Sequence, residues 1–284
     1  MSKTGEIMRL ADYDIILINS SAGKDSQAML DYIYSLAVAE DVADRITVVH
    51  ADLGRAEWSK TKELAAEQAA HYGARFEVVS RPPSQKALPG ASGDLLDHIK
   101  ERGMFPSSSA RYCTSDHKRG QVSKVITKLV EERRTGAVRP MLSFRPVRVL
   151  NCMGLRAEES PNRAKLPQLK RDARQTNGKR IVDVWLPIQD WSTDQVWERI
   201  RQAGTRYHPA YDLGMGRLSC VFCIFAPRQQ LVLAGRHHPE LLEQYVQVAR
   251  EIGHTFKADL SLAQVQQEIA DGAQGGAGEW GKAL

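Results

Sequence analysis

The chain has 284 residues, of which 42% are hydrophobic and 26% are charged, values typical of a globular protein. This composition excludes a mostly disordered chain, and no apolar run approaches the roughly 18–20 residues of a membrane-spanning helix. The first ten residues carry three charged side chains and no apolar stretch, so we expect no secretory signal and a cytoplasmic location. A net charge of +5 permits an anionic partner without demanding one.

The amino-terminal part alternates apolar strands with helices. An Ile-rich run at 13–19 is predicted to be a buried strand, followed by a loop at 20–26 and a helix at 27–38. A second strand at 46–50, a helix at 57–72 and a third strand at 75–80 come next. This alternation predicts an α/β fold with an open, mostly parallel twisted sheet and helices on both faces, of Rossmann-like type.

The rest of the chain is less regular. It predicts helices at 94–102, 115–134 and 193–203, strands at 146–153 and 181–185, a loop at 208–225, and terminal helices at 239–252 and 262–270. We therefore divide the chain into an α/β domain (1–204), a cysteine-containing loop with packed helices (205–271) and a flexible tail (272–284).

The loop at 20–26 places three serines, a glycine, a lysine and an aspartate between the first strand and the first helix. In an open parallel sheet, ligands bind beyond the carboxyl ends of the strands, where a turn of small residues offers backbone N–H groups to phosphate. Lys24 adds a cation, and Asp25 can hold a magnesium ion or orient the loop. The segment predicts a cradle for a triphosphate or pyrophosphate; the alternative is an ordinary turn of small residues. It matches neither the Walker loop nor the dinucleotide fingerprint.

Ser21–Ser26 resembles the PP-loop of the adenine-nucleotide alpha-hydrolase superfamily. More narrowly, residues 13–225 resemble the phosphoadenosine-phosphosulfate reductase family, and one departure is Ala22, where many PP-loops have glycine. The matching stretches are Ser21–Ser26, His50–Gly54, Arg111–Thr114 with Lys118 and Arg119, Gly154–Arg156 with Glu159 and Ser160, Pro187 and Ile188 with Trp191, and His208 and Pro209 with Tyr211 before Cys220.

The resemblance implies a role for each matching segment. The phosphates would be gripped by the PP-loop, the adenosine would lie beside the segment after the second strand, and a Gly-x-Arg segment would bring an arginine to phosphate or sulfate. The implied nucleotide-binding residues are Ser20, Ser21, Ala22, Gly23, Lys24, Asp25, Ser26, Asp52, Gly54, Gly154 and Arg156. We assign catalysis to Lys24, Asp25 and Arg156.

Arg156 also stands out without the resemblance. It follows an apolar strand at its carboxyl end, where a guanidinium can clamp a phosphate through two hydrogen bonds. Its alternative role is an ion pair with Glu158 or Glu159, and Arg163 is a weaker candidate for the same pocket.

Four cysteines are too few for a disulfide scaffold in a chain of this length. Cys220 and Cys223 have the spacing of metal ligands. Iron–sulfur members of the resembled family pair such a motif with an earlier cysteine segment, which implies a [4Fe-4S] cluster on Cys113, Cys220 and Cys223, with Cys152 as fourth ligand or with an open iron. Those members carry two adjacent cysteines where this chain has Tyr112 before Cys113. Zinc, redox thiols and, for Cys152, a buried apolar role are the alternatives.

The resemblance implies an ATP pyrophosphatase that adenylates a substrate oxygen for sulfur transfer, most like enzymes of DNA phosphorothioation. Its cofactors would be ATP, Mg²⁺ and the cluster, and its partners would be DNA and a cysteine desulfurase. The chain would form a homo-oligomer or be a subunit of a modification complex, and we expect no membrane partner. Eight basic residues within 156–180 predict a positive loop or lid for a phosphodiester backbone, or else a solvated insertion.

Three other functions remain open at this point. Family reductases carry a nucleophilic cysteine in a C-terminal tail, and no cysteine follows Cys223 here, so a sulfonucleotide reductase is the second interpretation. A tRNA-thiolating enzyme and a nucleotide-sensing subunit without turnover are the others.

Overall fold

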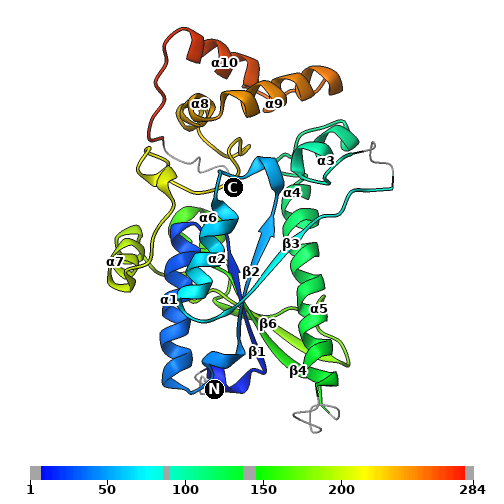
Figure 1. Cartoon of the computed structure of the whole chain (residues 1–284), viewed down its shortest axis with the longest axis vertical. Coiled ribbons are helices and arrows are strands. Elements are labelled where there is room, and N and C mark those ends of the chain that lie inside the picture. Colours follow the sequence, from blue (N-terminus) through cyan, green and yellow to red (C-terminus); the bar gives the residue numbers. More distant parts are fainter. Residues whose placement is uncertain (1–7, 86–89, 137–144, 279–284) are drawn as a thin grey trace.

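The computed structural model describes residues 8–85, 90–136 and 145–278, and in these ranges six strands form one sheet in the order β3-β2-β1-β4-β6-β5 (Figure 1). Five strands run parallel, and β5 pairs antiparallel with β6 at one edge. The strands are β1 (Ile15–Ser20), β2 (Ile46–Asp52), β3 (Arg75–Ser80), β4 (Val147–Cys152), β5 (Leu169–Arg171) and β6 (Arg180–Trp185). The predicted α/β fold with an open, mostly parallel sheet is confirmed.

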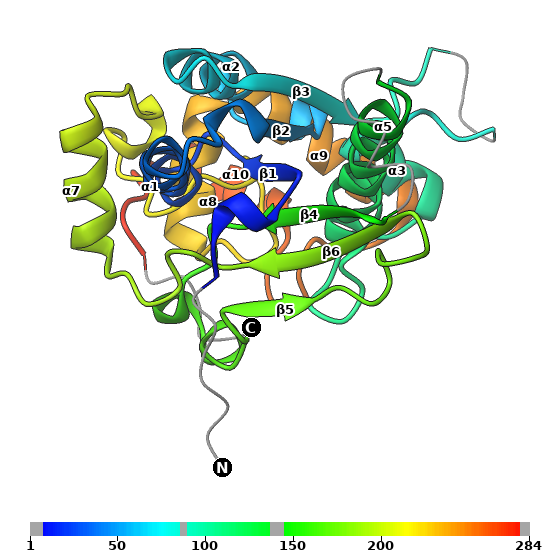
Figure 2. The ribbon, with the colours of Figure 1, turned by 90° about the horizontal axis from the view of Figure 1, so that it is seen from below.

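Helices cover both faces of this sheet (Figure 2). The helices are α1 (Lys24–Ala39), α2 (Thr61–His71), α3 (Leu95–Arg102), α4 (Tyr112–Thr114), α5 (Gly120–Thr135), α6 (Pro161–Ala164), α7 (Thr193–Ala203), α8 (Arg228–His237), α9 (Pro239–Ile252) and α10 (Leu262–Ala270). Side chains alternate along a strand, so Ile16 and Ile18 of β1 join the core under α1, and Ile15 and Leu17 join the core under α5. The site between β1 and α1 is therefore held by apolar packing on both sides of the sheet.

Helices α8, α9 and α10 form a separate cluster beyond the carboxyl ends of the strands, together with α3 (Figure 1). The sequence did not predict α8, in which the residues from Gln230 to Gly235 are all buried. At Gly235 a Cβ atom would lie 2.8 Å from Ile269 and 2.9 Å from Leu242, so glycine lets α9 and α10 pack closely on α8.

The segment after α10 runs along α8. Gly276 N donates to Gln229 O at 3.2 Å, and a Cβ atom at Gly275 would lie 2.5 Å from Leu233 N. Residues 279–284 lie outside the described residues, and the flexibility expected for 272–284 and the domain boundaries at 204 and 271 stay predictions. Among the described residues, no helix combines the length and the apolar character that crossing a bilayer requires.

The basic segment 156–180 is more ordered than the loop or lid that we expected. It contains the short helix α6 and then β5, which turns back antiparallel onto β6 and forms the edge of the sheet. Residues 169–171 are all exposed, so this edge strand lacks the apolar alternation by which strands are predicted.

Candidate functional site

The turn between β1 and α1 is closed on itself by serine hydroxyls. Ser26 Oγ donates to Gly23 O at 2.9 Å and accepts from Ser21 N at 3.2 Å, while Ser20 Oγ accepts from Ala22 N at 3.2 Å. Ala22 has a φ of 54°, a left-handed conformation that non-glycine residues adopt rarely, and it is fully buried. The serines predicted to donate to phosphate thus also fix the shape of the turn.

Two buried cations meet at Asp25, at the start of α1. Lys24 Nζ lies 3.4 Å from Asp25 Oδ2, Arg156 Nε lies 2.6 Å from Asp25 Oδ1, and both cationic side chains are only 4% exposed. Burial lowers the pKa of Lys24, and the charge of Asp25 opposes that shift. Of the two roles that we considered for Asp25, this geometry fits orientation of the loop and its cations.

A second charged group adjoins the first. The Glu159 side chain, 6% exposed, accepts from Arg156 N at 3.0 Å, forms an ion pair with Arg163, and pairs with Arg217 at 2.7 Å. Glu158 accepts from Arg156 Nη1 at 2.7 Å, so the alternative that we considered for Arg156, an ion pair with Glu158 or Glu159, is present with Glu158. Four cations and three carboxylates therefore surround the start of α1.

Sequence reasoning missed two residues of this site: Arg217, which pairs with Glu159, and Tyr211, whose hydroxyl accepts a hydrogen bond from Lys24 N at 2.8 Å. Arg217 and Tyr211 both come from the segment between α7 and the Cys-x-x-Cys motif, which we predicted only as a loop. Tyr211 belongs to a stretch that carries the family resemblance, but nothing in its spacing indicated contact with the loop at 20–26. Arg217 stands three residues before Cys220, and its sequence neighbourhood gave no signal of its own.

The glycines predicted at the site lie where backbones approach closely. A Cβ atom at Gly154 would lie 3.0 Å from Asp25 O, so this residue packs against the first turn of α1. Gly54 has a φ of 66°, and its Cβ would lie 2.5 Å from Asp94 Cβ. Asp52 Oδ1 accepts from Gly54 N at 2.8 Å and shapes the turn after β2. The predicted place of Asp52 and Gly54 beside an adenosine stays a prediction.

His50 is buried beside the turn between β1 and α1. Its Nδ1 atom lies 3.0 Å from Ser20 O, and its Nε2 atom lies 2.9 Å from Glu57 Oε2. Both ring nitrogens thus face oxygen acceptors, an arrangement that suits an imidazolium with two N–H donors. Burial lowers the pKa of His50, but the hydrogen bond and charge of Glu57 outweigh burial and raise the pKa above its usual value.

We expect the free energy of unfolding to fall as the pH rises above about 6.5. Because the folded state raises the pKa of His50, protonated His50 stabilises the fold below the unfolded pKa, and this contribution is lost as the pH passes the folded pKa. Urea denaturation of the wild-type protein and of His50→Gln at a series of pH values measures the effect. A difference between the two proteins that is constant over that series would contradict it.

The structure brings together three of the four cysteines. Cys113, Cys220 and Cys223 border the cluster that contains α8, α9 and α10, whereas Cys152 is fully buried in the core under α1. Cys152 follows Leu150 on the same face of β4, so the strand turns its thiol away from the other three. The apolar alternative for Cys152 matches this placement.

The [4Fe-4S] cluster that we expected on these thiols stays a prediction. In the parts of the chain that the structure describes, no three or more His, Cys, Asp or Glu side chains are grouped so that they could hold a metal ion. Burial raises the pKa of Cys220 to about 12, and Lys118 opposes this shift while Cys223 adds to it. Burial also raises the pKa of Cys113, so these two thiols are protonated at neutral pH.

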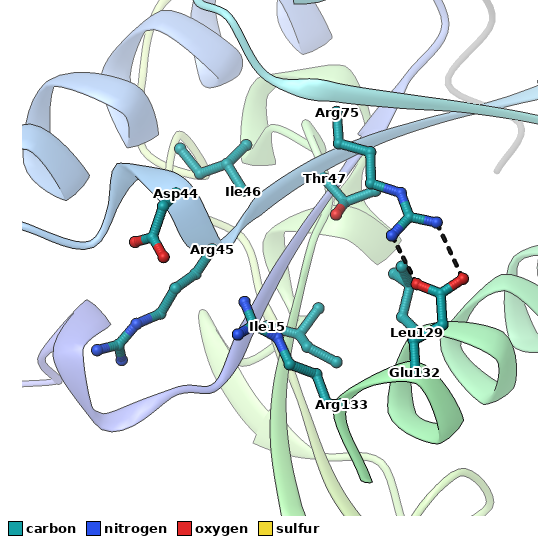
Figure 3. Close-up of a pocket in the computed structure, with 9 residues that line it drawn as sticks. All are labelled: Ile15, Asp44, Arg45, Ile46, Thr47, Arg75, Leu129, Glu132 and Arg133. Carbon is teal, nitrogen blue, oxygen red and sulfur yellow. Dashed lines mark hydrogen bonds and ion pairs between the residues drawn. The ribbon is translucent and has the colours of Figure 1, made fainter. Parts of the chain in front are cut away.

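Two cavities lie away from this site. One, of about 190 Å³, is at the amino ends of β1, β2 and β3, where Arg75 pairs with Glu132 (Figure 3). The other, of about 330 Å³, lies between α3 and α9. Ligands of open parallel sheets bind at the carboxyl ends of the strands, so we keep the start of α1 as the candidate site.

Comparison with known proteins gives a family match over most of the chain. Residues 15–226 match the model of the phosphoadenosine phosphosulfate reductase domain. The chain is 29% identical over 178 residues to an uncharacterized 37.8 kDa protein of Escherichia phage 186, covering 62% of this chain and 46% of that protein. It spans less than half the length of this relative and of two similar proteins of Methanocaldococcus jannaschii.

Two further proteins are similar to this chain. The adenosine 5'-phosphosulfate reductase of Allochromatium vinosum is 27% identical over 212 residues, which cover 75% of this chain and 69% of the reductase. The crystal structure of the phosphoadenylyl-sulfate reductase from Candida auris, in a phosphate complex, shares 15% identity at a TM-score of 0.46 and covers 74% of this chain and 83% of its own.

Proposed function

The chain belongs to the phosphoadenosine phosphosulfate reductase domain family, and on that premise we propose that it is an ATP pyrophosphatase acting in sulfur transfer. The observation that carries this proposal is the convergence of Lys24, Arg156, Arg163 and Arg217 at the start of α1, at the carboxyl ends of parallel strands. A helix start surrounded by cations and hydroxyls suits the charge and the acceptor oxygens of a polyphosphate.

The proposed reaction uses the Mg²⁺ complex of ATP as substrate. An oxygen of the acceptor attacks the α phosphorus, the bond from that phosphorus to the bridging oxygen breaks, and pyrophosphate leaves. Lys24 and Arg156 stabilise the charge that develops on the phosphates, and the fixed turn holds them in place. The terminal sulfur of a persulfide on a partner of the cysteine desulfurase class then attacks the activated atom, and AMP leaves. A thiol reductant cleaves the remaining S–S bond, so one sulfur stays on the acceptor and a disulfide is released.

A second candidate function is reduction of adenosine 5'-phosphosulfate. It is favoured by the similarity of the Allochromatium vinosum reductase over 75% of this chain. The same cations would then bind the phosphosulfate group instead of a polyphosphate.

Labelled substrates separate the two functions. The purified protein is incubated with Mg²⁺ and ATP labelled in the α phosphate, and in parallel with labelled adenosine 5'-phosphosulfate and a dithiol reductant. In this assay water takes the place of the acceptor oxygen, and formation of AMP and pyrophosphate from ATP supports the pyrophosphatase. Release of sulfite without any pyrophosphate would overturn it in favour of the reductase.

For the acceptor we propose DNA, on the evidence of the exposed edge of the sheet. The strand β5 lies at the edge of the sheet (Figure 2). Exposed basic residues belong to this strand and to the segments next to it in the chain. Neighbouring carboxylates are engaged elsewhere: Asp183 accepts from Tyr13 and Arg171, and Asp172 accepts from the N–H of Arg174. The basic edge consists of Lys165, Lys170, Arg174 and Lys179, for which the structure gives no ion pair among the described residues.

We expect DNA binding to depend on this basic edge. Replacing its four residues with glutamine should weaken duplex binding at least tenfold and reduce the slope of log K against log salt by about 3 to 4, since each lost phosphate contact contributes about 0.9. A filter-binding salt series measures both values, and ATP turnover without DNA should not change.

The matched control neutralises four exposed lysines on other elements, Lys60, Lys100, Lys124 and Lys128. An equal loss in this control would show that net charge, and not the basic edge, binds DNA. Tighter binding of a tRNA transcript than of duplex DNA would instead assign tRNA as the acceptor.

A further inference from the structure

Tyr211 reaches across from the segment after α7 to the first turn of α1. Its hydroxyl oxygen accepts hydrogen bonds from Lys24 N at 2.8 Å and from Leu218 N at 3.4 Å. A Cβ atom at Gly23 would lie 3.3 Å from the Tyr211 hydroxyl and 3.3 Å from Leu218 Cβ, so this segment lies directly on the turn. The backbone N–H of Lys24 is one of the N–H groups at the start of α1 that have no acceptor within the helix, and it donates to the phenol oxygen of Tyr211.

We propose that the Tyr211 hydroxyl stands in for a phosphate oxygen, and that nucleotide binding displaces it from Lys24 N. This inference rests on the proposed function, because it requires phosphate at this turn. A backbone amide carries one hydrogen, so Lys24 N cannot donate fully to the phenol and to a phosphate at the same time. The Lys24 ammonium, which donates to Gly216 O at 3.1 Å, changes partner in the same event.

The part that moves is the phenol side chain. The backbone around it is fixed, because Ala210 and Met215 are buried in the cluster with α8 and Met215 N donates to Ala210 O at 3.0 Å. The Tyr211 ring lies edge to face with Trp197, at 5.1 Å between ring centroids. Departure of the phenol from Lys24 N therefore changes the surroundings of Trp197.

Replacement of the Tyr211 hydroxyl by a ligand oxygen at Lys24 N favours an anionic ligand. Burial raises the pKa of Tyr211, so its hydroxyl is neutral at working pH and is a weaker acceptor than a phosphate oxygen. A ligand without phosphate forms no stronger hydrogen bond to Lys24 N than the Tyr211 hydroxyl does, so displacing the hydroxyl adds no binding free energy. Tyr211 thereby lowers the apparent affinity for every ligand and selects those that carry an anionic oxygen at this position.

Tyr211→Phe tests the proposal, because it removes the hydroxyl and keeps the ring. We expect this variant to bind Mg²⁺-ATP and inorganic pyrophosphate about three- to tenfold more tightly than the wild-type protein, the range of one neutral hydrogen bond. Isothermal titration calorimetry measures the affinities. Tyr207→Phe is the matched control. Tyr207 also contacts Trp197, at 5.3 Å between ring centroids, but its hydroxyl donates to Asp212 at 2.9 Å. The affinity of this variant for Mg²⁺-ATP and pyrophosphate should therefore not change.

Tryptophan fluorescence gives a second readout. Mg²⁺-ATP should change the emission of the wild-type protein, and most of this change should be lost in Trp197→Phe. If the wild-type protein binds ATP and Tyr211→Phe binds it equally or more weakly, the stand-in role is overturned and the proposed function survives. If neither protein binds ATP or pyrophosphate, both the proposed function and this inference fail.

Discussion

Lys24→Gln is expected to reduce pyrophosphate release from Mg²⁺-ATP by about 10²–10³-fold, the usual effect of losing one preorganised group that stabilises transition-state charge. The Lys24 side chain is 4% exposed and lies 3.4 Å from Asp25, so its charge is held in place before the substrate arrives. Glutamine removes the charge and keeps a hydrogen-bond donor on a side chain that is one bond shorter. Steady-state assays at several ATP concentrations separate the effect on turnover from that on KM.

Lys62→Gln is the control for this variant. Lys62 forms an ion pair with Asp52 at 3.2 Å, and its side chain is 47% exposed. We expect its rate to stay within about twofold of the wild-type rate, because exposed ion pairs contribute little. A Lys24→Gln protein that keeps its full rate would remove Lys24 from the catalytic residues.

The sequence predicted the arrangement of the site where periodicity and topology determine it. An apolar run followed by small polar residues and a helix identified β1, the turn and α1. Because β4 pairs in parallel with β1, residues that follow the two strands meet at one edge of the sheet. Arg156 therefore reaches Asp25, although 131 positions separate them in the chain.

Long-range loop packing and strand register were beyond what the sequence could predict. Tyr211 lies at the end of a single 3-10 turn (Pro209–Tyr211) and Arg217 in the loop after it, and both segments are too short to show a period that indicates the direction of a side chain. The resemblance left Cys152 as a possible fourth ligand, but the direction of its side chain depends on the pairing of Cys152 with Ile18 and Trp185. A shift of one residue along β4 would reverse the face, and the sequence alone does not define that register.

Arg156→Ala is expected to lower the free energy of unfolding by about 3–5 kcal/mol, the cost of breaking a buried ion pair by removing one partner. The Arg156 guanidinium is held by Asp25 at 2.6 Å, by Glu158 at 2.7 Å and by Thr193 Oγ1 at 3.2 Å. Its loss leaves Asp25 beside a single cation, and we also expect pyrophosphate release to stop. Urea denaturation measures the first effect, and the labelled-ATP assay measures the second.

Arg163→Ala is the matched control, because Arg163 belongs to the same charged group. Its partner Glu159 keeps Arg217, so we expect a loss of only about 1 kcal/mol, and equal losses in the two variants would contradict the central place of Arg156. Arg156→Lys then separates stability from catalysis. Lysine restores the charge but not the forked donor set, so a variant with recovered stability and absent turnover would show that the guanidinium acts on the phosphates as well as on Asp25.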